Sequence, residues 1–264
     1  MLHGRTCPAC SGQVLPEWEV LRLKSILSVR NLGIAFGSNE VLKSVNFDVY
    51  EQEVLGVIGP NGAGKTVMLN ILSGLLKPTH GTVTFLEKDI TRTRITERTY
   101  MGIGRTFQIP RSFEGMTVYE NVLTGGVYGR KLSEREAEKN AVEILALIGL
   151  RDSAYKKAGK LGLLARKRLE IGIALASRPK LILLDEVAGG LTNSEVAEIM
   201  KIVETIKAQG LSVIWIEHVM QTMIEGTDRV MLLSDGRDIL TATAPVIMVS
   251  REVSEVYLGA EDDE

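Results

Sequence analysis

The segment that most restricts how this chain can fold is Gly59-Pro60-Asn61-Gly62-Ala63-Gly64-Lys65-Thr66. It fits the pattern G-x-x-x-x-G-K-[ST] at every fixed position. Residues 54–58 form a compact apolar run that predicts a buried strand, and residues 66–76 predict a helix. Because a strand, a glycine-rich turn and a helix follow in this order, we expect an α/β protein with a loop that cradles phosphate.

The residue types of this segment suit the phosphates of a nucleotide. Glycines let the backbone curl so that successive N–H groups point at phosphate oxygens, and the following helix adds the positive end of its dipole. We expect Lys65 to neutralise the β- and γ-phosphates, and the Thr66 hydroxyl to bind Mg²⁺, a hard ion that prefers oxygen. The alternative, a glycine-rich turn without a ligand, is disfavoured by the flanking elements. The expected nucleotide-binding residues are Gly59, Pro60, Asn61, Gly62, Ala63, Gly64, Lys65, Thr66 and Val67.

A second segment supplies acidic side chains. Residues 181–184 are apolar and are followed directly by Asp185 and Glu186. A buried strand would present both carboxylates at its C-terminal end, where ligands bind in open α/β sheets. We expect Asp185 to hold Mg²⁺, directly or through water, and Glu186 to polarise the attacking water. A solvated Asp-Glu turn is the alternative, and the phosphate loop upstream disfavours it.

A histidine follows the predicted strand at residues 212–216. His218 would leave the sheet at the same edge as Asp185, from which it can reach a γ-phosphate. A purely structural role is equally compatible with the sequence.

Bulk composition limits the class of protein. The chain has 264 residues, of which 45% are apolar and 24% charged, as in ordinary globular proteins. The formal net charge of −2 gives no basic footprint for nucleic acid. The sequence has no uncharged apolar run of about 18 residues and no N-terminal pattern typical of a secretory signal. We therefore expect a cytoplasmic protein whose membrane role, if any, requires docking onto another protein.

The pattern along the chain predicts one large domain with additions. Residues 1–24 are expected to be an N-terminal extension, residues 25–259 the main domain, and residues 260–264 an acidic tail. Alternating strands and helices predict a mostly parallel sheet, and short strands after residue 25 add an antiparallel part. Charged, helix-periodic sequence at about residues 91–165 predicts a helical subdomain inserted into this core.

The N-terminal extension contains the only two cysteines, Cys7 and Cys10, in a C-x-x-C spacing. A closed structural zinc site needs four nitrogen or sulfur ligands, and only His3 lies nearby. Zinc binding would require ligands from another chain, and no strand–helix context supports a redox motif. A loosely ordered tail is the favoured interpretation.

Together these motifs resemble the ATPase subunits of ABC transporters over about residues 26–259, that is, a P-loop NTPase core with an inserted helical subdomain. Within that family the chain is most similar to the branch for uptake of branched-chain, or hydrophobic, amino acids. The segments that carry the similarity to this branch are residues 102–108, 116–121, 216–220 and 255–259.

The resemblance implies roles for individual residues. Phe36 corresponds to the aromatic residue that stacks on adenine, and Gln108 to the glutamine that senses Mg²⁺ and contacts the membrane subunit. Glu186 corresponds to the catalytic glutamate and His218 to the switch histidine. Core packing for Phe36 and an ordinary polar loop residue for Gln108 are the alternatives. The family further implies ATP and Mg²⁺ as ligands, ATP hydrolysis coupled to transport, and permease subunits at the inner face of the cell membrane as partners.

The resemblance fails at the segment that family members offer to a second ATPase subunit. The usual L-S-G-G-Q is here Leu161-Gly162-Leu163-Leu164-Ala165, the signature segment of this chain. Its serine is replaced by Gly162 and one glycine by Leu164. The proline after the two acids is Val187, an Asp or Asn near the dimer interface is Thr192, and Val67 lacks a usual hydroxyl.

These departures suggest that the chain pairs with a different ATPase subunit whose intact signature completes the site at Lys65 and Glu186. A homodimer remains possible. The alternative functions are a catalytically weak nucleotide-binding regulatory subunit, a soluble ABC ATPase acting on DNA or the ribosome, and a P-loop kinase. We further expect a socket for a membrane-protein helix, or else ordinary subdomain core, at Ile109, Phe113, Met116, Val118 and Tyr119.

Overall fold

The computed structural model describes residues 24–258, so Cys7, Cys10 and the expected acidic tail lie outside the described residues. The strands are β1 (Ser25–Phe36), β2 (Asn39–Tyr50), β3 (Val54–Ile58), β4 (His80–Phe85), β5 (Lys88–Asp89), β6 (Ile103–Arg105), β7 (Leu181–Asp185), β8 (Ser212–Ile216), β9 (Arg229–Ser234) and β10 (Arg237–Ala242). The helices are α2 (Lys65–Leu72), α3 (Ile95–Met101), α4 (Val118–Arg130), α5 (Glu134–Leu147), α6 (Leu163–Ala176), α7 (Asn193–Ala208), α8 (Met220–Gly226), α9 (Ala244–Met248) and α10 (Arg251–Leu258).

The strands form two sheets. The six-stranded sheet has the order β10-β9-β3-β8-β7-β6. All neighbours in it run parallel except β9 and β10. The four-stranded sheet, β2-β1-β4-β5, is antiparallel throughout. The predicted fold class, a mostly parallel sheet flanked by helices with an antiparallel part, is therefore confirmed.

The central strands follow from their uninterrupted apolar sequences. Every residue of β3, β7 and β8 is buried, as expected for parallel strands that are covered on both faces. Along β7, Leu181 and Leu183 face a core shared with α2 and the four-stranded sheet. Ile182 and Leu184 face a second core, which α6 and α7 cover. The sheet is thus a layer between two apolar cores, and its C-terminal edge has fixed positions.

One helix boundary differs from the one that the sequence predicts. Helix α2 ends at Leu72 rather than at residue 76, because Gly74 takes a left-handed conformation with φ 84° that turns the chain. Helix α6 begins at Leu163, so it starts within the signature segment. Thr192 caps α7, and its hydroxyl accepts a hydrogen bond from the backbone N–H of Glu195.

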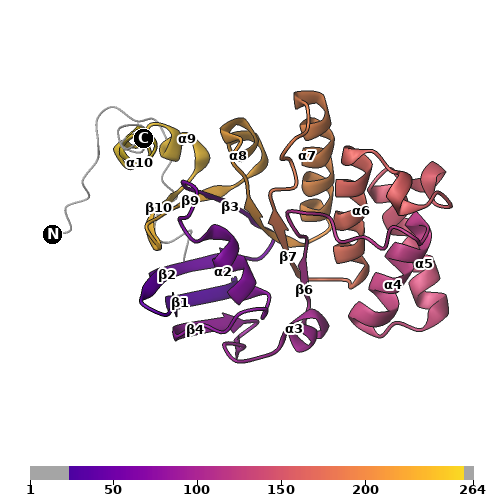
Figure 1. Ribbon diagram of the computed structural model, residues 1–264, viewed down its shortest axis with the longest axis horizontal. Coiled ribbons are helices and arrows are strands. Elements are labelled where there is room, and N and C mark those ends of the chain that lie inside the picture. Colours follow the sequence, from indigo (N-terminus) through magenta and orange to yellow (C-terminus); the bar gives the residue numbers. More distant parts are fainter. Residues whose placement is uncertain (1–23, 259–264) are drawn as a thin grey trace.

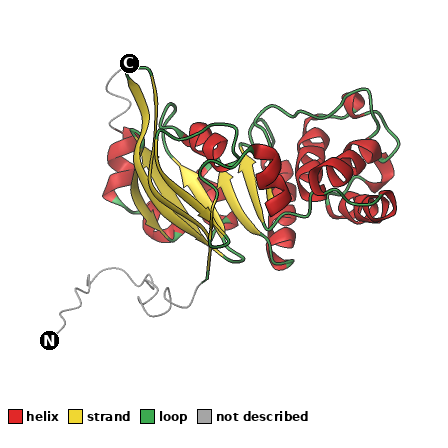
Figure 2. Cartoon of the chain, turned by 90° about the horizontal axis from the view of Figure 1, so that it is seen from below, coloured by secondary structure: helices red, strands yellow, loops and turns green. Residues whose placement is uncertain are grey.

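Helices α4, α5 and α6 pack against one another at one end of the molecule, away from strands β1, β2 and β4 (Figure 1). Seen from below, strands fill one part of the molecule and this group of helices forms the opposite end (Figure 2). Strand β6, within residues 91–165, belongs to the six-stranded sheet as the partner of β7. The chain therefore returns to the sheet before it enters the helical end.

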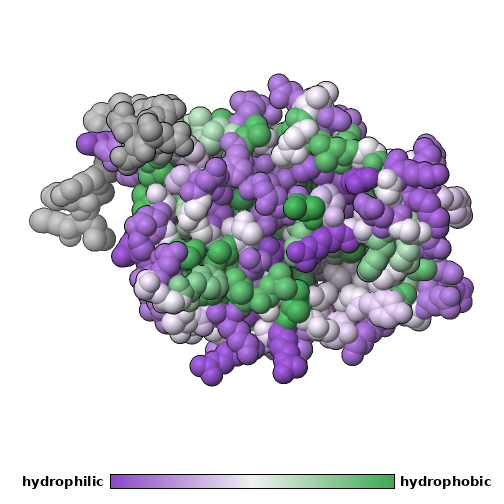
Figure 3. All heavy atoms as spheres, in the orientation of Figure 1, coloured by the Kyte–Doolittle hydropathy of each residue, from purple (hydrophilic) through white to green (hydrophobic). Residues whose placement is uncertain are grey.

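Among residues 24–258, no helix is long and apolar enough to cross a bilayer. On the face shown in Figure 3, hydrophilic residues surround scattered groups of apolar ones.

Candidate nucleotide-binding and catalytic site

The loop between β3 and α2 needs glycine for two reasons. At Gly59 φ is 151°, and a Cβ there would lie 1.9 Å from the carbonyl oxygen of Leu233. At Gly64 φ is 99°, and a Cβ would lie 2.5 Å from a methyl group of Leu42. Both positions therefore exclude a side chain sterically as well as by backbone conformation. The loop closes over the end of β3 at the C-terminal edge of the sheet, where ligands bind in open α/β folds.

Lys65 is the first residue of α2, and its side chain turns back onto the loop. Its Nζ donates to the carbonyl oxygens of Gly59, at 2.6 Å, and Pro60, at 2.9 Å. Burial lowers the pKa of Lys65, whereas the charges of Glu186 and Asp185 raise it. The ammonium is thus held at the loop, where phosphate oxygens can replace the two carbonyl groups as its partners.

The other loop residues expected to contact the nucleotide have different surroundings. Asn61, Gly62 and Thr66 are exposed, so their polar groups are accessible to a ligand. Ala63 is buried, and the side chain of Val67 packs partly against the apolar core.

Asp185 lies at the end of β7 and is 1% exposed. Its Oδ2 accepts from a guanidinium nitrogen of Arg105 at 3.3 Å. Its Oδ1 is buried and has no hydrogen-bond partner among the residues that the structure describes. Burial raises the pKa of Asp185, and the charge of Arg105 lowers it. A buried carboxylate oxygen is unfavourable unless a hydrogen-bond donor or a cation contacts it. A hard cation such as Mg²⁺ is a suitable partner for the Oδ1 of Asp185.

The carboxylate of Glu186 contacts two other predicted site residues. Its Oε2 accepts from Nε2 of Gln108 at 2.6 Å, and its Oε1 lies 2.8 Å from Nε2 of His218. These side chains come from the segments that follow β6, β7 and β8, three adjacent strands. The parallel sheet therefore brings Gln108, Glu186 and His218 together, although they are far apart in sequence. We call these three residues the Glu186 cluster.

The backbone of Glu186 is held in an uncommon conformation. Its φ is 49°, in the left-handed region that non-glycine residues seldom adopt. Its N–H donates to the carbonyl oxygen of Ile216 at 3.0 Å, and its carbonyl oxygen accepts from Nζ of Lys167 at 2.9 Å. These two contacts fix the backbone from which the carboxylate projects.

Phe36 lies at the end of β1, in the hairpin to β2, and is 50% exposed. Core packing, one of the two interpretations that the sequence left open, is therefore excluded. The ring is accessible for stacking on a flat ligand such as a nucleobase.

Sequence reasoning missed two residues that contact the site. Arg105 Nη1 donates to Oδ1 of Asn70 at 2.7 Å and to Oγ of Ser73 at 2.8 Å, while Nη2 reaches Asp185. It thereby joins α2, β6 and β7. The hydroxyl of Tyr257, from α10, accepts from the N–H of Gly59 at 3.0 Å. Both lie in segments noted for their similarity to the amino-acid branch, but their partners depend on tertiary structure.

The signature segment offers mostly aliphatic groups. Gly162 is the N-cap of α6 and makes no side-chain capping bond. Leu163 is 48% exposed, and Leu164 is partly buried against the core. A nucleotide of a partner subunit would meet the start of α6 without the hydroxyl that a serine provides.

The expected socket is only partly at the surface. Ile109 is 78% exposed and Phe113 is 55% exposed, so both are accessible to a partner. Val118 is fully buried and Tyr119 packs against the helical core. Val118 begins α4 and faces inward, so of the two interpretations left open for it, ordinary subdomain core is the one that its burial supports.

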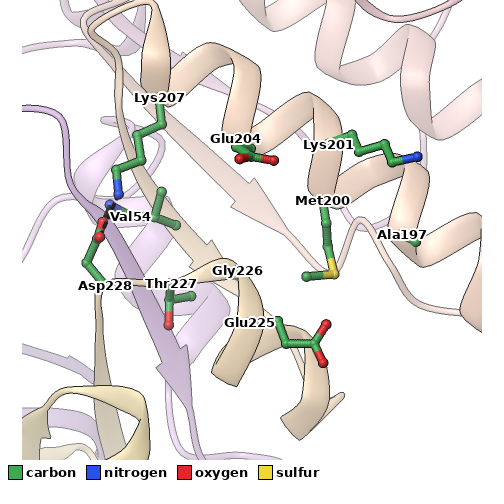
Figure 4. Close-up of a pocket in the computed structure, with 10 residues that line it drawn as sticks. All are labelled: Val54, Ala197, Met200, Lys201, Glu204, Lys207, Glu225, Gly226, Thr227 and Asp228. Carbon is green, nitrogen blue, oxygen red and sulfur yellow. Dashed lines mark hydrogen bonds and ion pairs between the residues drawn. The ribbon is translucent and has the colours of Figure 1, made fainter.

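A pocket of about 420 Å³ lies at the opposite edge of the sheet (Figure 4). Residues from α7 and α8 line it together with Val54, at the start of β3, and Asp228, just before β9. Lys207 and Asp228 form an ion pair at 2.5 Å. None of the predicted site residues lines this pocket, so it is separate from the nucleotide site.

Comparisons with known proteins agree with this geometry. The family model described as ABC transporter matches residues 42–189. The branched-chain amino acid transport ATP-binding protein LivG of Escherichia coli K12 is 32% identical over 249 residues, covering 89% of this chain and 98% of the relative. The lipopolysaccharide export ATP-binding protein LptB of Haemophilus influenzae is 31% identical over 235 residues, with the same coverage of both chains.

A solved structure gives the same result. The ADP conformation of MJ1267, an ATP-binding cassette of an ABC transporter, superimposes with a TM-score of 0.82 at 32% identity and covers 89% of this chain and 99% of that one. The chain therefore belongs to the ABC transporter family, as an ATP-binding subunit with ATPase activity. The comparisons do not favour the alternative of a catalytically weak regulatory subunit.

Proposed function

We propose that this subunit hydrolyses ATP to energise the uptake of branched-chain or other hydrophobic amino acids. The observation that carries the proposal is the similarity, over 89% of the chain, to LivG of Escherichia coli and to BraF of Pseudomonas aeruginosa, both described as branched-chain amino acid transport ATP-binding proteins. The similar identity to LptB, a lipopolysaccharide export protein, makes the cargo the part of the proposal that needs a direct test.

In the proposed mechanism the loop at residues 59–66 and Lys65 bind the phosphates, and Phe36 stacks on the adenine. Glu186 orients the attacking water, and His218 contacts the γ-phosphate. Thr66, Asp185 and Gln108 would hold Mg²⁺, which supplies positive charge to the phosphates when bound. The buried Oδ1 of Asp185 supports this assignment.

The geometry of the Glu186 cluster adds an activation step to this mechanism. Both carboxylate oxygens of Glu186 have a side-chain partner, Gln108 on one and His218 on the other. Each of these bonds occupies one of the lone pairs with which the Glu186 carboxylate could bind the attacking water. Bound nucleotide offers new partners to both side chains, so we propose that ATP binding frees Glu186 for its role.

The proposed assembly places the subunit on the inner face of the cell membrane, in the cytoplasm, against permease subunits. A second ATPase subunit with an intact signature would complete the site at Lys65 and Glu186. The aliphatic signature segment supports a heterodimer, because a second copy of this chain would not supply the missing serine hydroxyl.

Uptake of radiolabelled leucine tests the cargo. Cells that lack the chain are complemented with the wild type or with Lys65→Ala, and leucine uptake is compared with uptake of a sugar. We expect leucine uptake only with the wild type and no change for the sugar. Equal leucine uptake with both variants would contradict the proposed cargo.

Phe113→Asp tests the contact with the permease. Phe113 is 55% exposed and follows Gln108 closely in sequence, so a charge there disrupts an apolar contact with a membrane subunit without disturbing the core. We expect transport to fall on the order of 10-fold or more while ATP affinity is retained. Tyr155→Asp, at another exposed aromatic residue, is the control. Unchanged transport in Phe113→Asp would remove Phe113 from the docking surface.

A further inference from the structure

Helix α6 carries two buried charged residues that the proposed mechanism does not use. Lys167 is 5% exposed and Glu170 is 6% exposed. Their spacing of three residues places them on the same face of the helix. A buried charge is unfavourable unless it is hydrogen-bonded, so the partners of these two side chains are informative.

Lys167 bonds to the segment that follows β7. Its Nζ donates to the carbonyl oxygen of Glu186 at 2.9 Å. Burial lowers the pKa of Lys167, and the charges of Glu217 and Glu186 raise it. The contact is to the backbone of the residue whose φ is 49°, so it helps to hold Glu186 in its unusual conformation.

Glu170 bonds to the segment that follows β6. Its Oε2 accepts from the N–H of Arg111 at 3.0 Å. Burial raises the pKa of Glu170, and the backbone N–H groups of Arg111 and Phe107 lower it. Arg111 follows Gln108 by three residues, so the carboxylate holds the backbone of the segment that contains Gln108.

The two contacts converge on one interaction. Gln108 and Glu186, whose segments α6 holds, bond to each other at 2.6 Å. Three hydrogen bonds link these residues in a closed series. Lys167 bonds to Glu186, Glu186 bonds to Gln108, and Glu170 on α6 bonds to the segment that contains Gln108. Helix α6 itself begins in the signature segment and is anchored in the core by Leu169, Ile171 and Leu175.

We propose that Lys167 and Glu170 are positioning residues. They fix the Gln108 and Glu186 segments to α6 so that the two side chains meet in the geometry needed for hydrolysis. The inference rests on the proposed roles of Gln108 and Glu186. It also makes α6 part of this chain's own site, whatever its signature segment offers to a partner.

The test compares Lys167→Met and Glu170→Met with Arg168→Met in the full-length chain, mixed with a related ATPase subunit that has an intact signature. Methionine retains bulk but cannot make either hydrogen bond. Arg168 is the matched control, because it lies on the same helix but pairs with Glu198 on α7. Lys167→Arg and Glu170→Gln retain a donor and an acceptor, so they are the rescue variants.

We expect kcat to fall on the order of 10- to 100-fold in both methionine variants, as when a catalytic group is misplaced by about 1 Å, with an unchanged Kd for ATP. The rescue variants should recover much of kcat, and Arg168→Met should leave it unchanged. Equal losses in Arg168→Met, or a parallel loss of ATP affinity, would overturn the proposal, because both indicate general damage.

Amide hydrogen exchange tests whether Lys167 and Glu170 hold the Glu186 and Gln108 segments, and it does not depend on ATP hydrolysis. We expect faster exchange in residues 186–190 for Lys167→Met, in residues 107–111 for Glu170→Met, and in neither segment for Arg168→Met. If the wild type does not hydrolyse ATP even when mixed with a partner ATPase subunit that has an intact signature, the proposed function fails, and faster exchange confined to these segments still supports the holding role. Unchanged exchange in both segments would refute it.

Discussion

Two regions of this chain are proposed to contact nucleotides, and they differ sharply. The first consists of the phosphate loop and the Glu186 cluster. The second is the signature segment. In the first region, residues from the segments after three strands and from helix α6 make hydrogen bonds of 2.6–2.9 Å. In the second, Gly162 caps α6 without a side-chain bond, and Leu163 exposes an aliphatic side chain. The chain therefore contains one well-connected half of a site and one sparsely polar half.

This difference shows that fold and function constrain the two regions separately. Helix α6 packs correctly without polar groups at its start, because Leu169 and Leu175 anchor it in the core. The phosphate loop has no such freedom, because Gly59 and Gly64 have no room for a side chain. A signature segment can thus lose its polar groups while the fold and the chain's own phosphate loop persist.

Glu186→Gln is expected to have the largest effect on the connected region. The amide retains bulk but is a far weaker base, so we expect kcat to fall on the order of 100- to 10,000-fold with ATP binding retained. Turnover and retention of radiolabelled ATP measure the two effects. Glu204→Gln, at an exposed position on α7, is the control. A variant that hydrolyses ATP at the wild-type rate would show that Glu186 is not the base.

Restoring the signature should have a smaller effect. In Gly162→Ser with Leu164→Gly, a hydroxyl and a flexible backbone return to the start of α6. We expect turnover of the assembled pair to increase, at most to double, because only the second site gains contacts with the γ-phosphate. The measurement is steady-state hydrolysis of the pair. A large gain in the chain alone would mean that the two regions already act together in a homodimer.

Glu217→Gln should have the smallest effect and should change stability rather than chemistry. Burial raises the pKa of Glu217 above its ordinary value of 4.5, although the N–H groups of Ala188 and Trp215 lower it. The stability that Glu217 contributes is present below this ordinary value and is lost as the pH rises through the raised folded-state pKa. The glutamine variant should therefore gain stability relative to the wild type as the pH rises. The gain is about 1.4 kcal/mol for each tenfold difference between the acid dissociation constants of the folded and unfolded states.

Urea unfolding at several pH values measures this effect. Glu204→Gln, at an exposed site, should show no such trend. A constant difference between Glu217→Gln and the wild type from acid to neutral pH would contradict the raised pKa of Glu217.

The sequence predicts the parts of the fold whose residues follow a local rule. Strands β3, β7 and β8 are unbroken apolar runs, and the loop at residues 59–66 matches a pattern whose every fixed position has a physical reason. The end of α2 was predicted too late, because the left-handed turn at Gly74 depends on its surroundings. For Val118 the sequence left socket and core both open, because an apolar residue at a helix start has the same local pattern whether it faces a partner or the core.

The contacts within the site depend on tertiary structure, and their partners could not be predicted. Arg105 is buried between α2 and β7, where two neutral acceptors and Asp185 surround its guanidinium. Lys167 and Glu170 follow the signature segment in a charged run that resembles a solvated helix face. Nothing local indicates that they are buried, because the segments that cover them are those of Gln108 and Glu186.

We propose that this chain provides one complete half of a composite site and needs a partner for the other. Steady-state Mg-ATPase activity of the purified chain, alone and mixed with a related ATPase subunit that has an intact signature, tests it most directly. Lys65→Ala in this chain is the control for the site at its phosphate loop. We predict activity only in the mixture, and its loss when Lys65 is replaced. Full activity of the chain alone would contradict the claim, since the altered signature would then serve a homodimer.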